Sequence, residues 1–252
     1  MSRKANYRRA LILAGGKGTR LLPYTVVIPK PMLPIGDFPI IEIISRQLKF
    51  HGFNHVTVSL GHLSGMIELF LETLSKDELL PEFDFFSERS PLGTSGPVKA
   101  ISPEEENFMV INGDILTTLN MDAMFKEHEV SGAVLTVATR TTNYTLPLGS
   151  LILSDTLEVK DFQEKPTYTL FDNIGAYVYS SKVLEYIEND EKIDVNILIH
   201  RLIDAGEKVM AFRSDGPYFW IDIGTHADYE KANSQFTELL DQMPFLPKGR
   251  ES

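Results

Sequence analysis

Glycine and basic residues are concentrated in one short stretch that directly follows an apolar run. The stretch reads Leu13-Ala-Gly-Gly-Lys-Gly-Thr-Arg-Leu21. Its glycines let backbone N–H groups approach and surround phosphate oxygens, and Lys17 and Arg20 can neutralise the charge of a phosphate held there. An ordinary strand-to-loop turn has the same composition, so this stretch indicates a phosphate site without establishing one.

Two common phosphate-binding motifs are excluded by spacing. A Walker A loop needs glycine, four residues and then Gly-Lys-Ser/Thr, but Leu11 stands five positions before Gly16, and Gly18 follows the lysine. The dinucleotide fingerprint needs a third glycine where this sequence has Leu21. The loop therefore belongs to neither class.

A second stretch, Ile28-Pro-Lys-Pro-Met-Leu-Pro34, places Lys30 between two prolines. Prolines restrict the backbone, so a lysine there loses little conformational freedom when it becomes ordered. Such a lysine can present its ammonium group to a phosphate at a small entropic cost, although a surface loop could look the same.

The composition excludes several classes of protein. The 252 residues carry 24 Lys and Arg against 35 Asp and Glu, a formal net charge of −11, which disfavours nucleic-acid partners. There is no cysteine, which excludes disulfides and thiolate chemistry. The basic residues near the start are followed by only five apolar residues (positions 10–14), too few for a signal peptide or a membrane span. We expect a cytoplasmic protein with no membrane partner.

The apolar pattern alternates between strand and helix periodicity, which predicts an α/β fold. We expect a Rossmann-like, mostly parallel mixed sheet with helices on both faces. From Ser150 to Tyr179 strands follow one another without a helix, which predicts a small antiparallel lobe. Ser64 is predicted to cap a helix with an apolar stripe at Ile67, Phe70, Leu71 and Leu74. Predicted strands span 9–14, 55–60, 83–86, 108–112, 133–139, 209–212 and 218–221, and predicted helices span 121–130, 194–205 and 227–240, with others starting at 40, at 64 and after Thr94.

Seven motifs in this order resemble the sugar-1-phosphate nucleotidyltransferases, also called nucleotide-sugar pyrophosphorylases. The glycine stretch and the Lys30 stretch come first. The others are Pro91-Leu-Gly-Thr-Ser-Gly-Pro97, Asn112-Gly-Asp114, Glu164-Lys-Pro166, Asn173-Ile-Gly-Ala-Tyr177 and Trp220-Ile-Asp-Ile-Gly-Thr225. The resemblance runs from about Ala10 to about Ala232. The loop pattern is most similar to mannose- and heptose-1-phosphate guanylyltransferases.

The resemblance implies a nucleotide site. It assigns Arg20 to the β- and γ-phosphates, Lys30 to the phosphates during transfer, and Asp114 and Asp222 to a Mg²⁺ ion. Each aspartate alone could be a loop or helix cap, but both follow predicted strands, where open α/β sheets bind ligands. The nucleotide cradle would comprise Leu13, Ala14, Gly15, Gly16, Gly18 and Thr19, with Asp114, and the base-recognition loop would comprise Leu92, Gly93, Thr94 and Gly96.

The resemblance also implies a sugar-phosphate site within the antiparallel lobe. Glu164 and Asn173 match positions that bind sugar hydroxyls, and Lys165 matches the position that holds the sugar phosphate. Gly149 matches a glycine that lets the sugar approach the backbone. Leu148 and Ser95 stand where relatives often have tyrosine and alanine, which leaves the identity of the sugar and of the base open. We expect one domain over 1–252, with 8–145 mainly nucleotide-binding, 146–240 mainly sugar-binding and no C-terminal β-helix.

The implied reaction needs no general base. The second pKa of a phosphate monoester is about 6, so at pH 7 its oxygen is mostly anionic already. The obstacle is repulsion between two polyanions, about 4 kcal/mol per pair of unit charges at 4 Å and an effective dielectric of 20. Mg²⁺, Arg20, Lys30 and Lys165 would cancel that repulsion.

Several alternatives stay open from sequence. GTP with mannose or heptose 1-phosphate is preferred, but uridylyl or thymidylyl transfer to glucose 1-phosphate fits the same motifs. Cytidylyl transfer to a phospho-amino alcohol is a further possibility, and a non-catalytic nucleotide-sugar sensor is another. The last predicted helix carries a stripe at Tyr229, Ala232, Phe236 and Leu239, followed by Phe245 and Leu246. That stripe could pack on the chain's own core or form a contact in a homo-oligomer.

Overall fold

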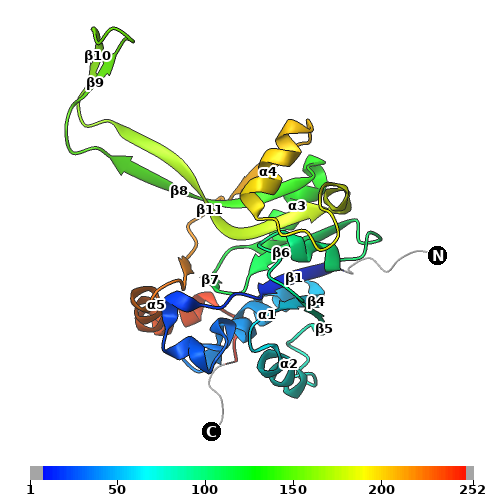
Figure 1. Ribbon diagram of the computed structural model, residues 1–252. Coiled ribbons are helices and arrows are strands. Elements are labelled where there is room, and N and C mark those ends of the chain that lie inside the picture. The colour runs from blue at the N-terminus through cyan, green and yellow to red at the C-terminus, as the bar shows by residue number, and fades with distance from the viewer. Residues whose placement is uncertain (1–7, 248–252) are drawn as a thin grey trace.

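A computed structural model describes residues 8–247. Its centre is a seven-stranded sheet in the order β12-β8-β11-β6-β1-β4-β5 (Figure 1). Strand β11 runs antiparallel to both neighbours, and the other pairs are parallel, so the expected mostly parallel mixed sheet is confirmed. The strands are β1 (Arg8–Ala14), β4 (Phe53–Leu60), β5 (Glu82–Ser87), β6 (Asn107–Asn112), β8 (Leu135–Thr145), β11 (Thr167–Ser180) and β12 (Val209–Arg213).

Side chains on the two faces of the sheet form two separate cores. Along β1, Ala10, Ile12 and Ala14 belong to one buried cluster, whereas Leu11 belongs to the other, as the alternation of a strand requires. Residues of α1 (Ile40–Phe50), α2 (Ser64–Thr73), α3 (Met121–Ser131) and α5 (His226–Leu239) lie in the first cluster, and residues of α4 (Val195–Asp204) lie in the second. Helices thus cover both faces, as predicted.

Short elements complete the fold. Three small antiparallel pairs accompany the main sheet: β2 (Pro34–Ile35) with β3 (Phe38–Pro39), β7 (Ile115–Thr117) with β13 (Trp220–Asp222), and β9 (Ser150–Leu153) with β10 (Val159–Gln163). The 3₁₀ turns are η1 (Thr19–Leu21), η2 (Tyr24–Val26), η3 (Lys30–Met32), η4 (Gly96–Ala100), η5 (Ser181–Tyr186) and η6 (Leu240–Gln242). The helix predicted after Thr94 is therefore the 3₁₀ turn η4.

The predicted cap of α2 is wrong. Ser64 is the first residue of the helix, and Leu63 occupies the N-cap position with φ 59° and no side-chain cap. The predicted stripe is only half buried, because Ile67 and Leu71 are in the core while Phe70 and Leu74 remain partly exposed. A leucine in the left-handed region replaces the hydroxyl cap that the sequence suggested.

The stripe on the last helix packs on the chain's own core. Ala232, Phe236 and Leu239 are buried in the first cluster. Phe245 and Leu246, in the segment after α5, are 8 % and 7 % exposed and join the same cluster. Of the two possibilities raised by the sequence, packing within the chain accounts for these residues.

An antiparallel arm projects from the sheet. Strands β8 and β11 stay paired from Thr139–Asn173 out to Thr145–Thr167, and the hairpin β9–β10 lies beyond that point. Figure 1 shows this arm, which we define as residues 140–172, extending away from the body of the molecule. The sequence predicted antiparallel strands here but not that they would leave the body. Among the described residues, no helix has the length and apolar character that crossing a bilayer requires.

Candidate active site

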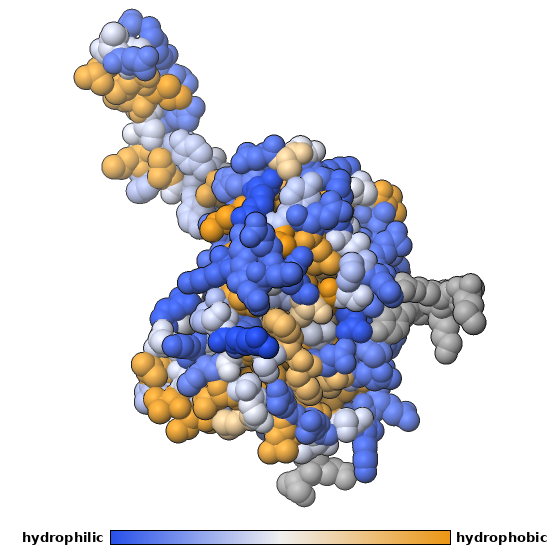
Figure 2. All heavy atoms as spheres, turned by 45° about the vertical axis from the view of Figure 1, so that its right-hand side comes forward, coloured by the Kyte–Doolittle hydropathy of each residue, from blue (hydrophilic) through white to orange (hydrophobic). Residues whose placement is uncertain are grey.

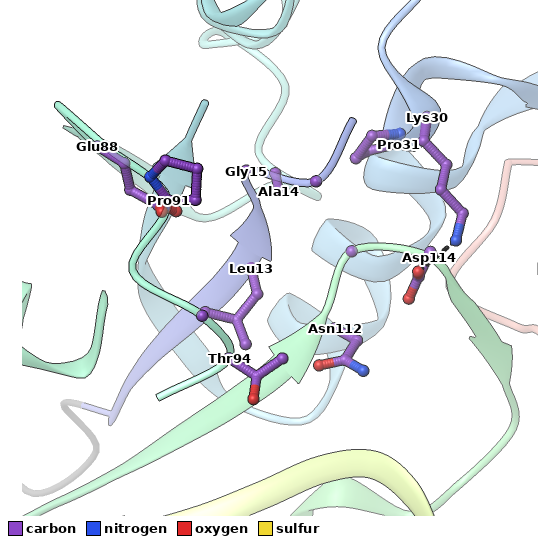
Figure 3. A pocket seen from close by; sticks show the side chains of 13 residues that line it. Leu13, Ala14, Gly15, Lys30, Pro31, Glu88, Pro91, Thr94, Asn112 and Asp114 are labelled. Atoms are coloured by element: carbon purple, nitrogen blue, oxygen red, sulfur yellow. Dashed lines mark hydrogen bonds and ion pairs between the residues drawn. The ribbon is translucent and has the colours of Figure 1, made fainter. Parts of the chain in front are cut away.

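A pocket of about 280 Å³ opens where β1 and β6 end (Figure 3). Carboxyl ends of parallel strands are where open α/β sheets bind ligands. The figure shows Glu88 on one side of the pocket and Lys30 with Asp114 on the other. The pocket is lined by Leu13, Ala14, Gly15, Gly16, Lys30, Pro31, Glu88, Pro91, Gly93, Thr94, Asn112, Gly113 and Asp114.

The glycine stretch passes tightly between its neighbours. The Gly113 N–H donates to the Leu13 carbonyl at 2.9 Å, which ties the end of β1 to the Asn-Gly-Asp turn. A Cβ on Gly15 would collide with the Glu88 carboxylate. Glycine at this position lets the chain pass close to the Glu88 carboxylate, which would have to move to admit a side chain.

Gly18 turns the loop back toward the body. Its φ of 60° lies in the left-handed region, and its carbonyl accepts from Thr25 Oγ1 at 2.8 Å and from the Leu21 N–H at 2.9 Å. A Cβ there would lie 2.9 Å from Thr25 Cγ2 and 3.2 Å from Lys30 Cβ. This turn leads into η1 and so positions Thr19 and Arg20 beside the pocket.

Two aspartates far apart in the sequence meet beside the pocket. Strand β13 pairs with β7 so that Asp222 stands opposite Ile115, and the Ile223 N–H donates to the Asp114 carbonyl at 2.9 Å. The Lys30 ammonium forms an ion pair with the Asp114 carboxylate and lies 3.9 Å from Asp222 Oδ1. Lys30 is buried, whereas the Asp114 and Asp222 side chains are 28 % and 45 % exposed, so water screens these charges in part.

The Asp222 carboxyl is poised for a cation. Burial and then the charge of Asp114 raise its pKa, while Lys30 and Arg20 oppose that shift. Its Oδ1 is buried without a hydrogen-bond partner. Arg20 is close as well, because a Cβ on Gly224 would lie 3.4 Å from both the Arg20 guanidinium and Asp222 Oδ2. An orphaned carboxylate oxygen beside a second carboxylate is an unfavourable arrangement unless a positive charge arrives.

These residues fit a magnesium ion. Mg²⁺ takes one or two carboxylates and fills its other positions with water and substrate phosphates. Asp114 and Asp222 provide that number of carboxylates. Over residues 8–247, no group of three or more acidic, histidine or cysteine side chains is placed to hold a metal by itself.

The predicted base-recognition loop is anchored to α4. The Thr94 N–H donates to Asp194 Oδ1 at 3.0 Å, and Thr94 Oγ1 accepts from the Val195 N–H at 2.8 Å. Gly93 has φ 76°, and a Cβ there would approach the Ile193 carbonyl to 2.6 Å. This anchoring holds Gly93 and Thr94 on the pocket wall.

The predicted nucleotide residues fall into three groups according to their position relative to the pocket. Leu13, Ala14, Gly15, Gly16, Lys30, Gly93, Thr94 and Asp114 line it. Gly18, Thr19, Arg20 and Asp222 lie beside it in the loop and strand just described. Leu92 is buried with its N–H donating to Glu88 Oε2 at 2.9 Å, and Gly96 begins η4 behind it.

The predicted sugar residues are separated. Asn173 lies near the pocket, because its Oδ1 accepts from the Gly175 N–H at 3.0 Å, and a Cβ on Gly175 would approach the pocket residue Asn112 to 2.6 Å. Glu164 and Lys165 lie beyond the outer end of the arm ladder, and that end is itself about 20 Å from Asn173 at the rise of an extended strand. One chain does not bring them to its own pocket.

Gly149 also lies on the arm, with a local reason for being glycine. A Cβ there would collide with the Phe162 ring and lie 3.1 Å from Glu164 Oε2. Gly149 and Glu164 are therefore neighbours, which the sequence implied only through their common sugar role.

Two polar side chains of the pocket were assigned no role from the sequence. Glu88 follows β5 at the same edge of the sheet and accepts from Ser59 Oγ at 2.6 Å. Asn112 lies within the Asn-Gly-Asp motif, yet only the aspartate was assigned a role; its Oδ1 is buried without a hydrogen-bond partner. Their position at strand ends is the signal that could have identified both.

Comparisons with known proteins agree with this geometry. A family model described as Nucleotidyl transferase matches residues 9–238. The chain is 31 % identical over 242 residues to a UTP--glucose-1-phosphate uridylyltransferase of Synechocystis sp., with 89 % of this chain covered. It spans 62 % of the length of that relative. It is also 31 % identical to a D-glycero-alpha-D-manno-heptose 1-phosphate guanylyltransferase of Aneurinibacillus thermoaerophilus, with 92 % of this chain and 99 % of the relative covered.

A solved structure has the same fold. HddC from Yersinia pseudotuberculosis complexed with GMP-PN aligns with a TM-score of 0.66 at 28 % identity, covering 91 % of this chain and 99 % of the other. The family match extends over most of the sheet and includes the glycine loop, Lys30 and both aspartates. The family model matches residues 9–238, which is most of the chain, and the pocket lies at the carboxyl ends of the strands. The chain therefore belongs to the nucleotidyl transferase family.

Proposed function

We propose that this chain is a magnesium-dependent sugar-1-phosphate nucleotidyltransferase. It would join a nucleoside triphosphate to a sugar 1-phosphate and release pyrophosphate. The observation that carries the proposal is the meeting of Lys30, Asp114 and Asp222 beside a glycine-lined pocket. A pocket that only bound a nucleotide sugar would have no need of two adjacent carboxylates, whose mutual repulsion is unfavourable without a cation.

Each part of the pocket has a proposed task. Backbone N–H groups of the Gly15–Arg20 loop bind the triphosphate, with Arg20 at the β- and γ-phosphates. Lys30 leaves its ion pair with Asp114 to contact the phosphates during transfer. A magnesium ion held by Asp114 and Asp222 would neutralise charge on the phosphate oxygens and help to orient them.

The reaction is an in-line displacement at the α-phosphorus. An anionic oxygen of the sugar phosphate forms a bond to that phosphorus, and the bond to the β-phosphate oxygen breaks, so that pyrophosphate leaves with the electron pair. No proton has to be removed, since the attacking oxygen is mostly ionised at pH 7. Positioning and charge neutralisation supply the rate enhancement.

For the finer specificity we propose GTP with mannose or heptose 1-phosphate. The Leu92–Gly96 loop supports this choice, as does the heptose 1-phosphate guanylyltransferase that this chain matches over nearly the whole length of both. Uridylyl transfer to glucose 1-phosphate is the second candidate, because the Synechocystis relative is equally identical.

A matrix of substrates tests the proposal. The purified chain is incubated with Mg²⁺ and each of GTP, UTP, dTTP and CTP, each combined with mannose, glucose or heptose 1-phosphate or with phosphocholine, and pyrophosphate release is measured. We expect turnover with at least one sugar 1-phosphate, and highest with GTP. Turnover confined to CTP with phosphocholine would assign the phospho-amino alcohol reaction instead.

A binding measurement separates an enzyme from a sensor. Nucleotide with Mg²⁺ should raise the melting temperature, since a ligand that binds only the native state stabilises it. A raised melting temperature without pyrophosphate release for any pair of substrates would identify a non-catalytic binding protein. The Asp114→Asn variant serves as the control for contaminating activity.

A further inference from the structure

Exposed apolar side chains are much denser on the arm than on the rest of the described chain. Among the described residues, 24 large hydrophobic side chains are exposed, and 12 of them lie within the 33 residues of the arm. Figure 2 shows apolar side chains gathered along one side of the arm's tip. The arm residues are Tyr144, Leu146, Leu148, Leu151, Ile152, Leu153, Leu157, Val159, Phe162, Tyr168, Leu170 and Phe171.

Four of these side chains share one face of the tip. In the β9–β10 hairpin, Leu151 pairs with Phe162 and Leu153 with Val159, and directly paired residues project to the same side of a hairpin. Soluble monomers rarely expose contiguous apolar patches of this kind. An isolated two-stranded ribbon is also marginally stable in water, so this face needs a surface to cover it.

The arm also carries two charged side chains without a bonding partner among the described residues. Glu164 and Lys165 are exposed and make no hydrogen bond or ion pair with any of residues 8–247. Lys165 adopts φ 45°, a conformation that costs energy for a residue with a side chain.

The body of the molecule has a matching surface beside the pocket. Leu22, Tyr24, Val26 and Val27 are 48–64 % exposed in one loop between the proposed phosphate ligands Arg20 and Lys30. Thr25 Oγ1 donates to the Gly18 carbonyl, so the same loop is tied to the nucleotide cradle. We name residues 22–27 the apolar loop.

The pocket itself has little positive charge. Among its lining residues Lys30 is the single basic side chain, whereas Glu88 and Asp114 are both acidic. Two polyanionic substrates need more positive charge than this, and Arg20 with a metal ion leaves the sugar phosphate without a dedicated cation. The arm's Lys165 would meet that need, but in its own chain the arm holds it beyond the outer end of the ladder, which is itself about 20 Å from Asn173.

We propose that two copies of this chain exchange arms. The apolar tip of one copy packs on the apolar loop of the other, and the arm thereby brings its Glu164 and Lys165 to the pocket of that second copy. This exchange deepens the proposed function and rests on it, because it makes each sugar-phosphate site a product of two chains. An exchange of identical elements closes with two-fold symmetry, so neither arm stays uncovered.

The available area suits a stable dimer. If each of the exposed apolar side chains of the arm hides about 80 Å², roughly half of what a buried aromatic side chain hides, two arms contribute on the order of 2,000 Å². That area lies in the range of homodimer interfaces. An arm folded against the body of its own chain would cover the same apolar side chains. Cross-linking between two differently labelled chains distinguishes that arrangement from an exchange.

The first experiment measures oligomeric state and needs no activity. Sedimentation of the full chain should give a dimer, and the double variant Leu151→Asp, Phe162→Asp should sediment as a monomer with an unchanged melting temperature of the body. The matched control is Val130→Asp, which changes an 89 % exposed apolar residue on α3 and should stay dimeric. A monomeric wild-type chain, or a double variant that remains dimeric, overturns the proposal.

The second experiment locates the partner surface. Because the chain has no cysteine, Val26→Cys in one preparation can be mixed with a single cysteine at Leu148, Leu151, Leu153 or Phe162 in another and treated with a short bis-maleimide. A cross-linked dimer of the two variants supports the exchange. When Val130→Cys is used in place of Val26→Cys, no cross-linked dimer should form. Failure at all four tip positions overturns it, as does a chain carrying both cysteines that cross-links only within itself.

The third experiment tests the shared site. Chains carrying Asp114→Asn and Lys165→Ala, with different tags, are co-expressed and purified as a mixed dimer. Neither variant alone should turn over, but the mixed dimer should recover about half of the wild-type rate, because one of its two sites combines an intact body with an intact arm. No recovery overturns the exchange, whereas an inactive wild-type chain would instead reject the proposed function.

Discussion

The charges of Lys30, Asp114 and Asp222 do not balance one another, because one ammonium group faces two carboxylates. Lys30 pairs with Asp114, so Asp222 retains a buried oxygen without a hydrogen-bond partner. Burial and the nearby Asp114 charge raise the pKa of Asp222 as a result. Sites assembled for ligand charge are commonly unfavourable without the ligand.

Asp222→Asn should therefore separate stability from activity. A raised pKa means that the stabilising contribution of the protonated form is present at low pH and is lost as the pH rises through the folded-state pKa. At pH 7 without metal, the asparagine variant should melt about 1–2 °C higher, a small gain because water screens a part-exposed carboxylate. Its turnover should fall by about a hundredfold or more. Asp241→Asn, on the exposed turn η6, should change neither quantity.

Gly18 and Gly16 provide a matched pair of substitutions in one loop. Gly18→Ala places a Cβ in the left-handed region and 2.9 Å from Thr25 Cγ2, so we expect a loss of about 1–2 kcal/mol in the free energy of unfolding. At Gly16 a Cβ meets nothing within 4 Å. Urea unfolding of both variants checks this prediction, and equal losses would show that the turn at Gly18 is not strained by a side chain.

At the scale of elements, His128 joins α3 to the sheet. Its ring nitrogens lie 2.8 Å from Thr136 Oγ1 on β8 and 3.2 Å from Asn107 Oδ1 on β6. Burial lowers the pKa of His128 to about 4. The neutral ring is thus part of the packing of this helix.

The pH dependence of the free energy of unfolding should reveal that the His128 ring is neutral in the folded chain. An unfolded histidine takes up a proton near pH 6.5 and the folded one does not, so the stabilisation is present above pH 6.5 and is lost as the pH falls toward 4. Between pH 6.5 and pH 5 the free energy of unfolding should drop by about 1–2 kcal/mol. His128→Gln should be less stable at pH 7 but should lose most of this drop. An exposed histidine on α4, changed in His200→Gln, should leave the drop intact.

At the scale of the whole molecule, the body and the arm should be separable. The arm ladder ends at the pair Thr145–Thr167, and the Leu146 N–H donates to the Pro166 carbonyl at 3.0 Å. Replacing residues 146–166 by Asn-Gly would close the ladder with a two-residue hairpin turn. The shortened chain should melt within a few degrees of wild type and keep its nucleotide-induced shift, because the removed residues add nothing to either core. Calorimetry that showed a largely unfolded chain would contradict this division.

The shortened chain should also lose turnover, by about a hundredfold or more, since it lacks Glu164 and Lys165, the residues proposed to bind the sugar phosphate. The melting shift with nucleotide and Mg²⁺ is the control that its body is intact. Full turnover would contradict the proposed roles of Glu164 and Lys165.

Much of the body could be predicted from sequence. The apolar run of β1, the helical spacing of Ile40, Ile41, Ile44 and Leu48, and the glycine loop between them depend on interactions within a few residues. The structure places these elements as predicted. The cap of α2 could not be predicted, because Leu63 takes a left-handed conformation that its residue type does not favour.

By itself the sequence determined the α/β architecture and the family, and it predicted a phosphate site in the first loop, since periodicity, turn residues and ordered motifs are local. The sequence grouped Asp114 with Asp222 only through the family resemblance. Only the tertiary structure decided that Glu88 and Asn112 form the pocket wall, and that Glu164 and Lys165 stand away from it on an arm. These placements depend on which strands pair across long separations and where a ribbon leaves the sheet. Such choices follow from the packing of the whole chain, and no short stretch of residues encodes them.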